Sequence, residues 1–294
     1  MSKIPKLIKT KLGYYQFETL PSNEELQKYY RDKYYQEGRG IYQVSYSEDE
    51  RRWMSLRAEI VRLRTAQLIP DSKLCLLDVG CGEGWLMDSF KKAGHLVKGI
   101  DFSSAGIEKM HPHLLDSFIQ GDLYTHLDNL SAMHERYDVV SCCNVIEHVQ
   151  DPARMVESLK QVVKKGGYLI IVAPNDFSEL HEYLLKEKII SRPWWVCYPD
   201  HLSYFNKASM ENFLSANGLK IDAVLADNPV DLNLLNDSSN YIEDTTKGKA
   251  VHRYRVRFDN LIASIDVNKL VQLYDLMGSM GIGRNLAYFT KVLA

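Results

Sequence analysis

Two kinds of hydrophobic pattern alternate along the central part of the chain. Short, continuous apolar runs predict buried strands at 73–80, 95–101, 117–122, 137–145, 168–176, 219–227 and 285–294. Segments with apolar residues at helical spacing lie between them, at 84–94, 103–110, 151–167, 177–190 and 206–218. Strands that are apolar throughout are typical of a parallel sheet covered by helices on both faces. The alternation therefore predicts an α/β fold with a doubly wound, mostly parallel sheet.

Two regions depart from this alternation. The N-terminal part has no convincing strand pattern, but an apolar stripe predicts a helix at 47–69. The alternation also loosens after Asn175, and residues from about 228 to 284 look like an insertion, with helices predicted at 249–265 and 267–280. We therefore divide the chain into an N-terminal helical region (1–70), an α/β core (71–227), a helical insertion (228–284) and a last core strand (285–294).

Composition narrows the functional classes. The net charge is −2 over 294 residues, which gives no bulk attraction for nucleic acid or for a membrane surface. The sequence shows neither the apolar core of a secretion signal nor a run of about 18 apolar residues, so we expect no signal peptide and no membrane span. The five cysteines are odd in number and lack paired CxxC spacing, which predicts reduced thiols in a cytoplasmic protein.

The segment LLDVGCGEGW carries the clearest chemical information. A predicted strand ends near Asp78, and Gly80, Gly82 and Gly84 then allow a tight turn that brings the backbone close to a ligand. A dinucleotide fingerprint would need a further glycine where this chain has Trp85. The loop therefore predicts a ligand at the carboxyl end of the strand, but not a pyrophosphate cradle.

Acidic residues end the next two predicted strands as well. Asp101 lies about 20 residues beyond the glycine loop, at a distance typical of a carboxylate that binds both ribose hydroxyls. Phe102 follows it and could lie against an adenine face. Asp122 ends the third strand and could accept a hydrogen bond from an adenine amino group. The alternative for each residue is an ordinary polar group at a strand end.

Taken together, LLDVGCGEGW, GIDFSSAGI, QGDLY, YDVVSCCNVIEHVQDP and GGYLIIVAPN resemble the motifs of class I S-adenosylmethionine-dependent methyltransferases. The resemblance implies a Rossmann-like seven-stranded sheet whose last strand is antiparallel, and S-adenosyl-L-methionine as cofactor. It also implies a role for each motif. The residues implied in cofactor binding are Asp78, Gly80, Cys81, Gly82 and Gly84 for the methionine part, Asp101 for the ribose, Asp122 and Leu123 for the adenine, and Asn144 near the methyl group.

The fourth strand leads into NVIEH, which places Glu147 and His148 next to the expected methyl group. Ubiquinone-biosynthesis O-methyltransferases and small-RNA 2′-O-methyltransferases carry a similar Glu-x-x-Glu-His cluster with a later histidine, and the cluster can hold a divalent metal. Here Asn144 replaces the first glutamate, and His201 in PDHLSYF is the later histidine. We therefore assign no metal ligand and take Glu147, His148 and His201 as candidate catalytic residues.

Three interpretations of the Glu-His pair stay open from the sequence. Glu147 could have a structural role, in which it bonds to the backbone or to Arg154 ahead of the following helix. His148 or His201 could act as a general base, because imidazole titrates near neutral pH. A divalent metal bound to oxygen and nitrogen ligands is the third interpretation.

The acceptor has to be inferred from the regions outside the core. Tyrosines are frequent in the N-terminal region and could form a wall against sugars or aromatic rings; they are Tyr14, Tyr15, Tyr29, Tyr30, Tyr34, Tyr35, Tyr42 and Tyr46. A basic cluster in the insertion could meet the phosphates of a nucleotide-linked acceptor; it consists of Lys247, Lys249, His252, Arg253, Arg255 and Arg257. The alternatives are a packed helix stripe for the tyrosines and a solvated helix face for the cations.

We expect a small-molecule acceptor whose hydroxyl is methylated, first a saccharide or nucleotide-linked sugar. The C-terminal part resembles methyltransferases of bacterial surface-polysaccharide biosynthesis, which favours this class. A quinone-type phenol is the second candidate because of the Glu-His similarity, and RNA is third because the chain lacks an overall basic face. A methyltransferase-like protein that binds cofactor without catalysis is the alternative from another class.

Overall fold

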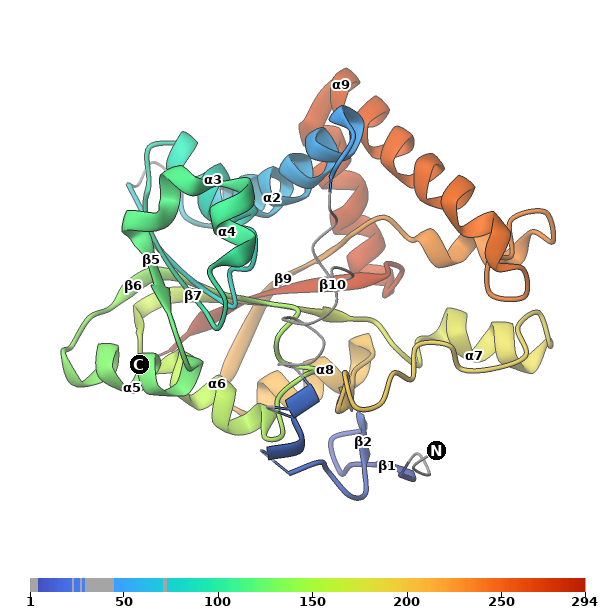
Figure 1. Cartoon of the computed structure of the whole chain (residues 1–294), viewed down its shortest axis with the longest axis horizontal. Helices are drawn as coiled ribbons and strands as arrows, with labels where there is room; N and C mark the ends of the chain where they lie inside the picture. The colour runs from blue at the N-terminus through green and yellow to red at the C-terminus, as the bar shows by residue number, and fades with distance from the viewer. Residues whose placement is uncertain (1–4, 23, 27, 30–44, 71–72, 294) are drawn as a thin grey trace.

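The computed structural model describes residues 5–22, 24–26, 28–29, 45–70 and 73–293. A seven-stranded sheet forms the centre, in the order β5-β4-β3-β6-β7-β10-β9 (Figure 1). Its strands are β3 (Cys75–Val79), β4 (Leu96–Asp101), β5 (Phe118–Gln120), β6 (Tyr137–Cys143), β7 (Val163–Pro174), β9 (Leu219–Ala226) and β10 (Asn285–Val292). β3 to β7 are parallel, whereas β10 is antiparallel to both β7 and β9. The predicted fold class is confirmed, including the antiparallel last strand.

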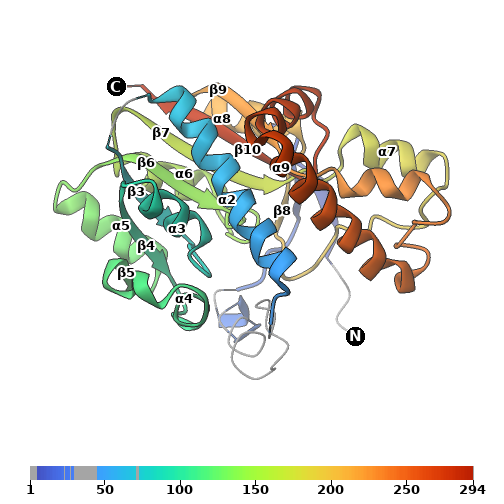
Figure 2. The ribbon, with the colours of Figure 1, turned by 90° about the horizontal axis from the view of Figure 1, so that it is seen from above.

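Helices cover both faces of this sheet (Figures 1 and 2). One face carries α2 (Glu48–Leu68), α3 (Trp85–Lys92), α4 (Ala105–Met110) and α9 (Gly248–Met280). The other carries α5 (Leu123–Ala132), α6 (Pro152–Lys160) and α8 (Lys207–Ala216). The short helix α7 (Glu179–Lys186) extends from the side of the sheet, close to the first half of α9.

Helix α2 belongs to the layer that packs on the sheet. Its start is fixed by a capping box, in which Ser47 and Glu50 satisfy each other's backbone amides. Leu56 and Ile60 are buried in the main hydrophobic core, and Trp53 is buried against α9. The division into four regions stays a prediction, but this helix of the N-terminal region is packed onto the core.

Helix α9 consists of two arms joined at a kink (Figure 1). Asp266 leaves helical geometry at the junction, with φ −165° and ψ 109°. Its side chain accepts a hydrogen bond from the amide of Asn268 at 2.8 Å, so it caps the second arm. The two helices predicted in the insertion, with a break between 265 and 267, are therefore confirmed.

A second, three-stranded sheet was not predicted from the sequence. It joins β1 (Leu7–Lys9) and β2 (Tyr15–Phe17) to β8 (Ser203–Tyr204) in antiparallel order. The segment 191–205, which the sequence pattern presents as a loop, thus contains a strand. Strands this short have too few residues for an alternating pattern to be recognised.

The boundary between α6 and β7 also differs from the expectation. The predicted helix at 151–167 ends at Lys160, and β7 begins at Val163. A side chain at Gly167 would lie only 2.8 Å from the carbonyl oxygen of Asp138, so glycine is needed here for the close approach of β6. Gly166 and Gly167 thus belong to a strand, and Gly166 does not end the helix. Helix α5 was likewise not predicted.

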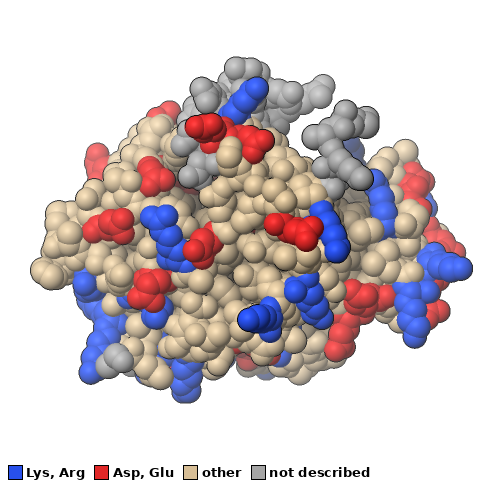
Figure 3. Space-filling model, turned by 90° about the horizontal axis from the view of Figure 1, so that it is seen from below, with Lys and Arg blue, Asp and Glu red and all other residues tan. Residues whose placement is uncertain are grey.

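Basic and acidic side chains are interspersed on the face shown in Figure 3. Its coloured residues form no extended surface of one sign, which agrees with the near-zero net charge. None of the helices in the described ranges combines the length and the apolar character needed to cross a lipid bilayer. The cytoplasmic location stays a prediction from the cysteine pattern.

Candidate active site

The predicted ligand-binding residues gather at one edge of the central sheet. Asp78 lies in β3 just before the glycine loop, and Asp101 is the last residue of β4. Asp122 follows β5, and Asn144 directly follows β6. Because these four parallel strands are neighbours, their carboxyl ends meet along the same edge, where ligands bind in doubly wound sheets.

The glycine loop needs glycine for two separate reasons. Gly80, Gly82 and Gly84 all have positive φ, at 77°, 53° and 81°. A Cβ on Gly80 would also overlap the side chain of Val145, which follows β6. The amide of Gly82 donates a hydrogen bond to Asp101 Oδ2 at 2.8 Å. The loop after β3 is therefore tied to the end of β4.

Asp78 is a buried carboxyl beneath this loop, with 3% of its surface exposed. The hydroxyl of Ser141 donates a hydrogen bond to its Oδ1 at 2.7 Å. Burial raises the pKa of Asp78 to about 7, and the charge of Asp101 acts in the same direction, against the hydrogen bond from Ser141. The carboxyl of Asp78 thus keeps its proton in the folded protein over a pH range in which the unfolded chain has released it.

A pH-dependent stability difference follows for Asp78→Asn. The pKa is raised in the folded state, so the contribution of Asp78 to stability falls as pH rises from about 4 to about 7. The melting temperature of Asp78→Asn, measured relative to that of the parent, should therefore be higher at pH 8 than at pH 5. Thermal unfolding of both proteins at the two pH values measures this change. An equal difference at both pH values would contradict the raised pKa.

The remaining predicted cofactor residues lie in less enclosed positions. Both carboxylate oxygens of Asp101 accept backbone hydrogen bonds, from Gly82 and, at 3.1 Å, from Ser103. Phe102 is 57% exposed, which leaves its ring accessible. Asp122 is the N-cap of α5, where its Oδ1 accepts the amide of Thr125 at 2.9 Å, and Leu123 begins that helix. The order of these groups along the edge matches the predicted order.

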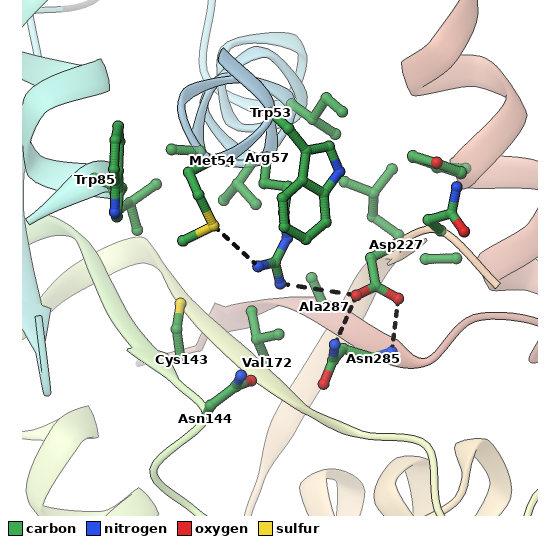
Figure 4. Close-up of a pocket in the computed structure, with 18 of the residues that line it drawn as sticks. Trp53, Met54, Arg57, Trp85, Cys143, Asn144, Val172, Asp227, Asn285 and Ala287 are labelled. Atoms are coloured by element: carbon green, nitrogen blue, oxygen red, sulfur yellow. Dashed lines mark hydrogen bonds and ion pairs between the residues drawn. The ribbon is translucent and has the colours of Figure 1, made fainter. Parts of the chain in front are cut away.

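A cavity of about 220 Å³ opens next to the glycine loop (Figure 4). Its floor is formed by Asp78, Gly80, Cys81 and Asn144 from the ends of β3 and β6. Asn144 has φ 54°, a left-handed conformation that asparagine tolerates better than most residues. Helix α2 forms the opposite wall (Figure 4). The cavity is lined by residues predicted to bind the methionine part of the cofactor and also by Asn144, so it spans the expected reaction centre. We call it the first cavity.

Sequence reasoning missed several polar residues of the first cavity, among them Arg57, Asp227 and Asn285. Arg57 of α2 lies over the ring of Trp53 and forms an ion pair with Asp227, with 3.8 Å between Nη2 and Oδ2. Asn285 donates to Asp227 through its backbone amide at 2.7 Å and its side-chain amide at 2.6 Å (Figure 4). Asp227 and Asn285 could have been found, since an antiparallel last strand begins at the edge where its neighbour ends.

Glu147, His148 and His201 form a cluster behind Asn144 and are not among the described residues that line the first cavity. The carbonyl of Glu147 accepts the amide of Leu202 at 2.7 Å, which fixes the segment that carries His201. The rings of His148 and His201 pack nearly perpendicular, with centroids 4.8 Å apart. His148 Nδ1 lies 2.7 Å from the carbonyl oxygen of Asp200, so in the neutral imidazole Nδ1 carries the proton and Nε2 the lone pair.

The chemistry of this cluster centres on a buried carboxyl. Glu147 is 2% exposed, and its Oε2 has no hydrogen-bond partner in the described structure. Burial raises the pKa of Glu147 to about 7, although His148 opposes the shift. Donor atoms of Glu147, His148 and His201 lie within 4.8 Å of one another, so they could supply three ligands to a divalent ion.

Part of the structural interpretation of Glu147 is wrong, namely its pairing with Arg154. Its side chain does not pair with Arg154, whose guanidinium lies over the ring of Tyr124 at 4.3 Å. Arg154 instead belongs to the first turn of α6, where its amide is capped by Asp151. A structural role through the backbone, the acid-base interpretation and the metal interpretation all stay open.

The N-terminal tyrosines differ in the contacts that they make. Tyr14 stacks on Phe205 with 4.6 Å between centroids, and Tyr15 packs against Phe177. Tyr46 donates a hydrogen bond to Glu83 in the glycine loop, at 3.0 Å to Oε2. Tyr30, Tyr34, Tyr35 and Tyr42 lie outside the described residues. Tyr14 and Tyr15 thus pack against other rings, and Tyr46 reaches the predicted cofactor edge.

Comparisons with known proteins agree with this geometry. Residues 47–224 match the family model described as "Methyltransferase domain". The chain is 39% identical over 102 residues to a ubiquinone biosynthesis O-methyltransferase from Saccharophagus degradans, and 38% identical over 107 residues to that from Nitrosomonas europaea. These matches cover 34% and 35% of this chain, and only 43% and 45% of the two relatives. The chain thus spans less than half the length of either.

A solved structure extends the likeness to nearly the whole fold. The plantazolicin methyltransferase BamL, determined in complex with a triazolic desmethylPZN analog and S-adenosylhomocysteine, superimposes with a TM-score of 0.52. The superposition covers 92% of this chain and 96% of that protein, at 14% sequence identity. At this identity the likeness concerns the fold.

Proposed function

Because the chain belongs to the class I S-adenosylmethionine-dependent methyltransferase family, we propose that it transfers a methyl group from S-adenosylmethionine to a hydroxyl of a small-molecule acceptor. The resemblance inferred from the motifs is confirmed at the level of family and fold. The observation that carries the proposal is the convergence of Asp78, the glycine loop, Asp101, Asp122 and Asn144 on one edge of the sheet.

The cofactor would lie along this edge. The residues of the glycine loop would bind its methionine part, Asp101 its ribose and Asp122 with Leu123 its adenine. Arg57 supplies a cation on the opposite wall of the first cavity, suited to the cofactor carboxylate or to an anionic acceptor. Methyl transfer needs the acceptor in line with the methyl group, so much of the acceleration would come from positioning.

A hydroxyl acceptor must also lose a proton. His148 Nε2 lies 3.8 Å from Oε1 of Glu147, and the ring of His201 packs beside that of His148. We propose that one of these histidines accepts the proton, with Glu147 stabilising the imidazolium that forms. If a divalent ion binds, the same three residues would hold it, and the ion would lower the pKa of the acceptor hydroxyl.

For the acceptor we propose a saccharide or nucleotide-linked sugar. The support is polar: Arg57, Asp227 and Asn285 offer charged and amide groups next to Asn144. A quinone-type phenol is the second candidate, favoured by the relatives that carry the name ubiquinone biosynthesis O-methyltransferase.

The deciding experiment is transfer of labelled methyl from S-adenosylmethionine into three separate pools. The pools are saccharides with nucleotide sugars, catechol-type phenols, and small RNA. Label in the first pool supports the proposal, and label only in the second replaces it with the phenolic acceptor. Binding of S-adenosylhomocysteine without label in any pool would favour a cofactor-binding protein without catalysis.

A further inference from the structure

A second cavity of about 240 Å³ is lined by Arg255, whose guanidinium lies over the ring of Trp53, a residue that lines the first cavity. It opens between the first arm of α9, the segment that contains η2 (Val230–Leu235), and the loop after α7. Figure 1 shows these elements side by side at one end of the molecule. The residues that matter for the argument are Trp194, Tyr241, Gly248, Val251, Arg255 and Arg284. Its walls thus combine flat aromatic and aliphatic surface with two guanidinium groups.

Arg284 is already neutralised. Its Nη1 lies 2.8 Å from Asp176 and 3.8 Å from Asp231, and both carboxylates are buried. Its guanidinium also stacks on Trp194 at 4.7 Å. These two carboxylates raise the pKa of Arg284 against the effect of burial. Arg284 therefore shapes the cavity but leaves no surplus charge for a ligand.

Arg255 is different. Its guanidinium is largely enclosed, lies over the Trp53 ring at 4.6 Å, and has no carboxylate within 4.0 Å among the described residues. Among the described residues, the single hydrogen bond of Arg255 joins Nη2 to His252 Nδ1 at 3.0 Å, and its Nε has no partner there. Burial and the neighbouring charge of Arg57 lower its pKa, against the more distant carboxylates of Asp227 and Asp259, which raise it. A largely enclosed cation without a close counter-ion is costly, so a negative group in contact with the Arg255 guanidinium would stabilise it.

The other cations of the predicted basic cluster do not share this position. Lys249, Arg253 and Arg257 are exposed, so for them the interpretation as a solvated helix face holds. Lys247 binds the carbonyl of Asp237 at 2.6 Å. His252 is paired with Glu50 at 3.1 Å. Only Arg255 among the six combines enclosure, a cavity and the lack of a carboxylate partner in the described structure.

We propose that the second cavity binds an anionic group, a phosphate or a carboxylate, joined to a flat or apolar body, with Arg255 as its counter-ion. A guanidinium binds both kinds of oxyanion through paired hydrogen bonds. Trp194 and Tyr241 provide the flat surface for the attached body. We assign this ligand to the anionic part of the methyl acceptor, an assignment that rests on the proposed function. Trp53 connects the two cavities, because it contacts both Arg57 and Arg255.

Binding of simple probes tests the cavity without any knowledge of the acceptor. Phenyl phosphate and benzoate serve as the phosphate and carboxylate probes, and benzyl alcohol is the uncharged control. The affinity for each is measured by calorimetry on protein saturated with S-adenosylhomocysteine. The parent should bind one anion at least tenfold more tightly than benzyl alcohol. Arg255→Met should remove this preference and Arg255→Lys should retain part of it, whereas Arg257→Met on the exposed face should change nothing. Equal binding by the parent and Arg255→Met would overturn the proposal.

A second variant blocks the space and leaves the charge in place. Gly248 has helical φ and ψ, of −53° and −45°, and a Cβ there would meet no heavy atom within 4 Å. Gly248→Phe should therefore fold at least as stably as the parent, yet fill the cavity and lower anion binding at least tenfold. Unchanged anion binding by a folded Gly248→Phe protein would place the anion elsewhere. This readout stays available even if Arg255→Met fails to fold.

Steady-state kinetics then tests the link to the acceptor. With the acceptor found by label transfer, Arg255→Met should raise its KM at least tenfold and leave the affinity for S-adenosylhomocysteine unchanged. If the probes bind but Arg255→Met leaves the KM of the acceptor unaltered, the second cavity binds an anion other than the acceptor. A parent protein that binds phenyl phosphate or benzoate but no S-adenosylhomocysteine would refute the proposed function and leave the anion site standing.

Discussion

Asp101→Ala should lower the affinity for S-adenosylhomocysteine by about a hundredfold or more. The expectation combines two losses. The carboxylate accepts the amides of Gly82 and Ser103, which hold the glycine loop against β4, and it would bind both ribose hydroxyls. Hydrogen bonds to a charged group contribute about 1.5–3 kcal/mol each, so loss of two corresponds to at least a hundredfold. Isothermal titration calorimetry with S-adenosylhomocysteine measures the change.

The matched control is Asp116→Ala, which removes an exposed carboxylate from the short helix η1 (Pro112–Ser117) before β5. It should bind S-adenosylhomocysteine like the parent. Gly82→Leu should lose binding as Asp101→Ala does, because Gly82 combines positive φ with the amide that contacts Asp101. Retained micromolar affinity in Asp101→Ala and Gly82→Leu together would refute the assignment of the cofactor to this edge.

His148→Ala or His201→Ala should lower turnover by about two to four orders of magnitude, the usual range for loss of a general base. Their affinity for S-adenosylhomocysteine should stay within about twofold of the parent, because neither residue is among those that line the first cavity. Single-turnover methyl transfer with the acceptor found by label transfer separates the two effects. Loss in only one variant would identify the base.

His134→Asn is the control for these variants. His134 is exposed on the turn after α5 with φ 57°, a conformation that asparagine adopts easily, so turnover should be unchanged. A chelator distinguishes the acid-base interpretation of the cluster from the metal interpretation. We expect little effect of chelation, because Asn144 replaces the glutamate that the resemblance implies. A large loss restored by magnesium or manganese would show that Glu147, His148 and His201 hold a metal.

The sequence predicts the central sheet well because its strands are buried on both faces. A strand such as β6 is apolar along nearly its whole length, so the pattern marks it without knowledge of its neighbours. The polar residues at the strand ends could be predicted for the same reason, since parallel strands present their carboxyl ends at one edge. Asp101 and Asp122 are found there.

What escaped prediction depends on contacts between segments far apart in the chain. Gln16 pairs with Ser203 across 187 positions in the small sheet, and no local pattern reveals such a pairing. Arg57 meets Asp227 because α2 lies across the sheet edge. Within one helix turn, Arg255 is enclosed while Arg253 and Arg257 face solvent, and charge counts cannot distinguish them.

The kink at Asp266 divides α9 into two arms whose residues can be substituted with different freedom as related proteins diverge. The second arm buries Leu270, Val271 and Tyr274 in the main core, so substitutions there cost stability of the whole domain. The first arm contributes no fully buried residue to that core, but it lines the second cavity. New acceptors could therefore be accommodated by exchange of the segment between Asp227 and Asp266, while the hydrogen bonds of Asp227 to Asn285 keep its attachment to the sheet. In the proposed function, ligand choice would thus depend mainly on the first arm of α9, and the main hydrophobic core on the second.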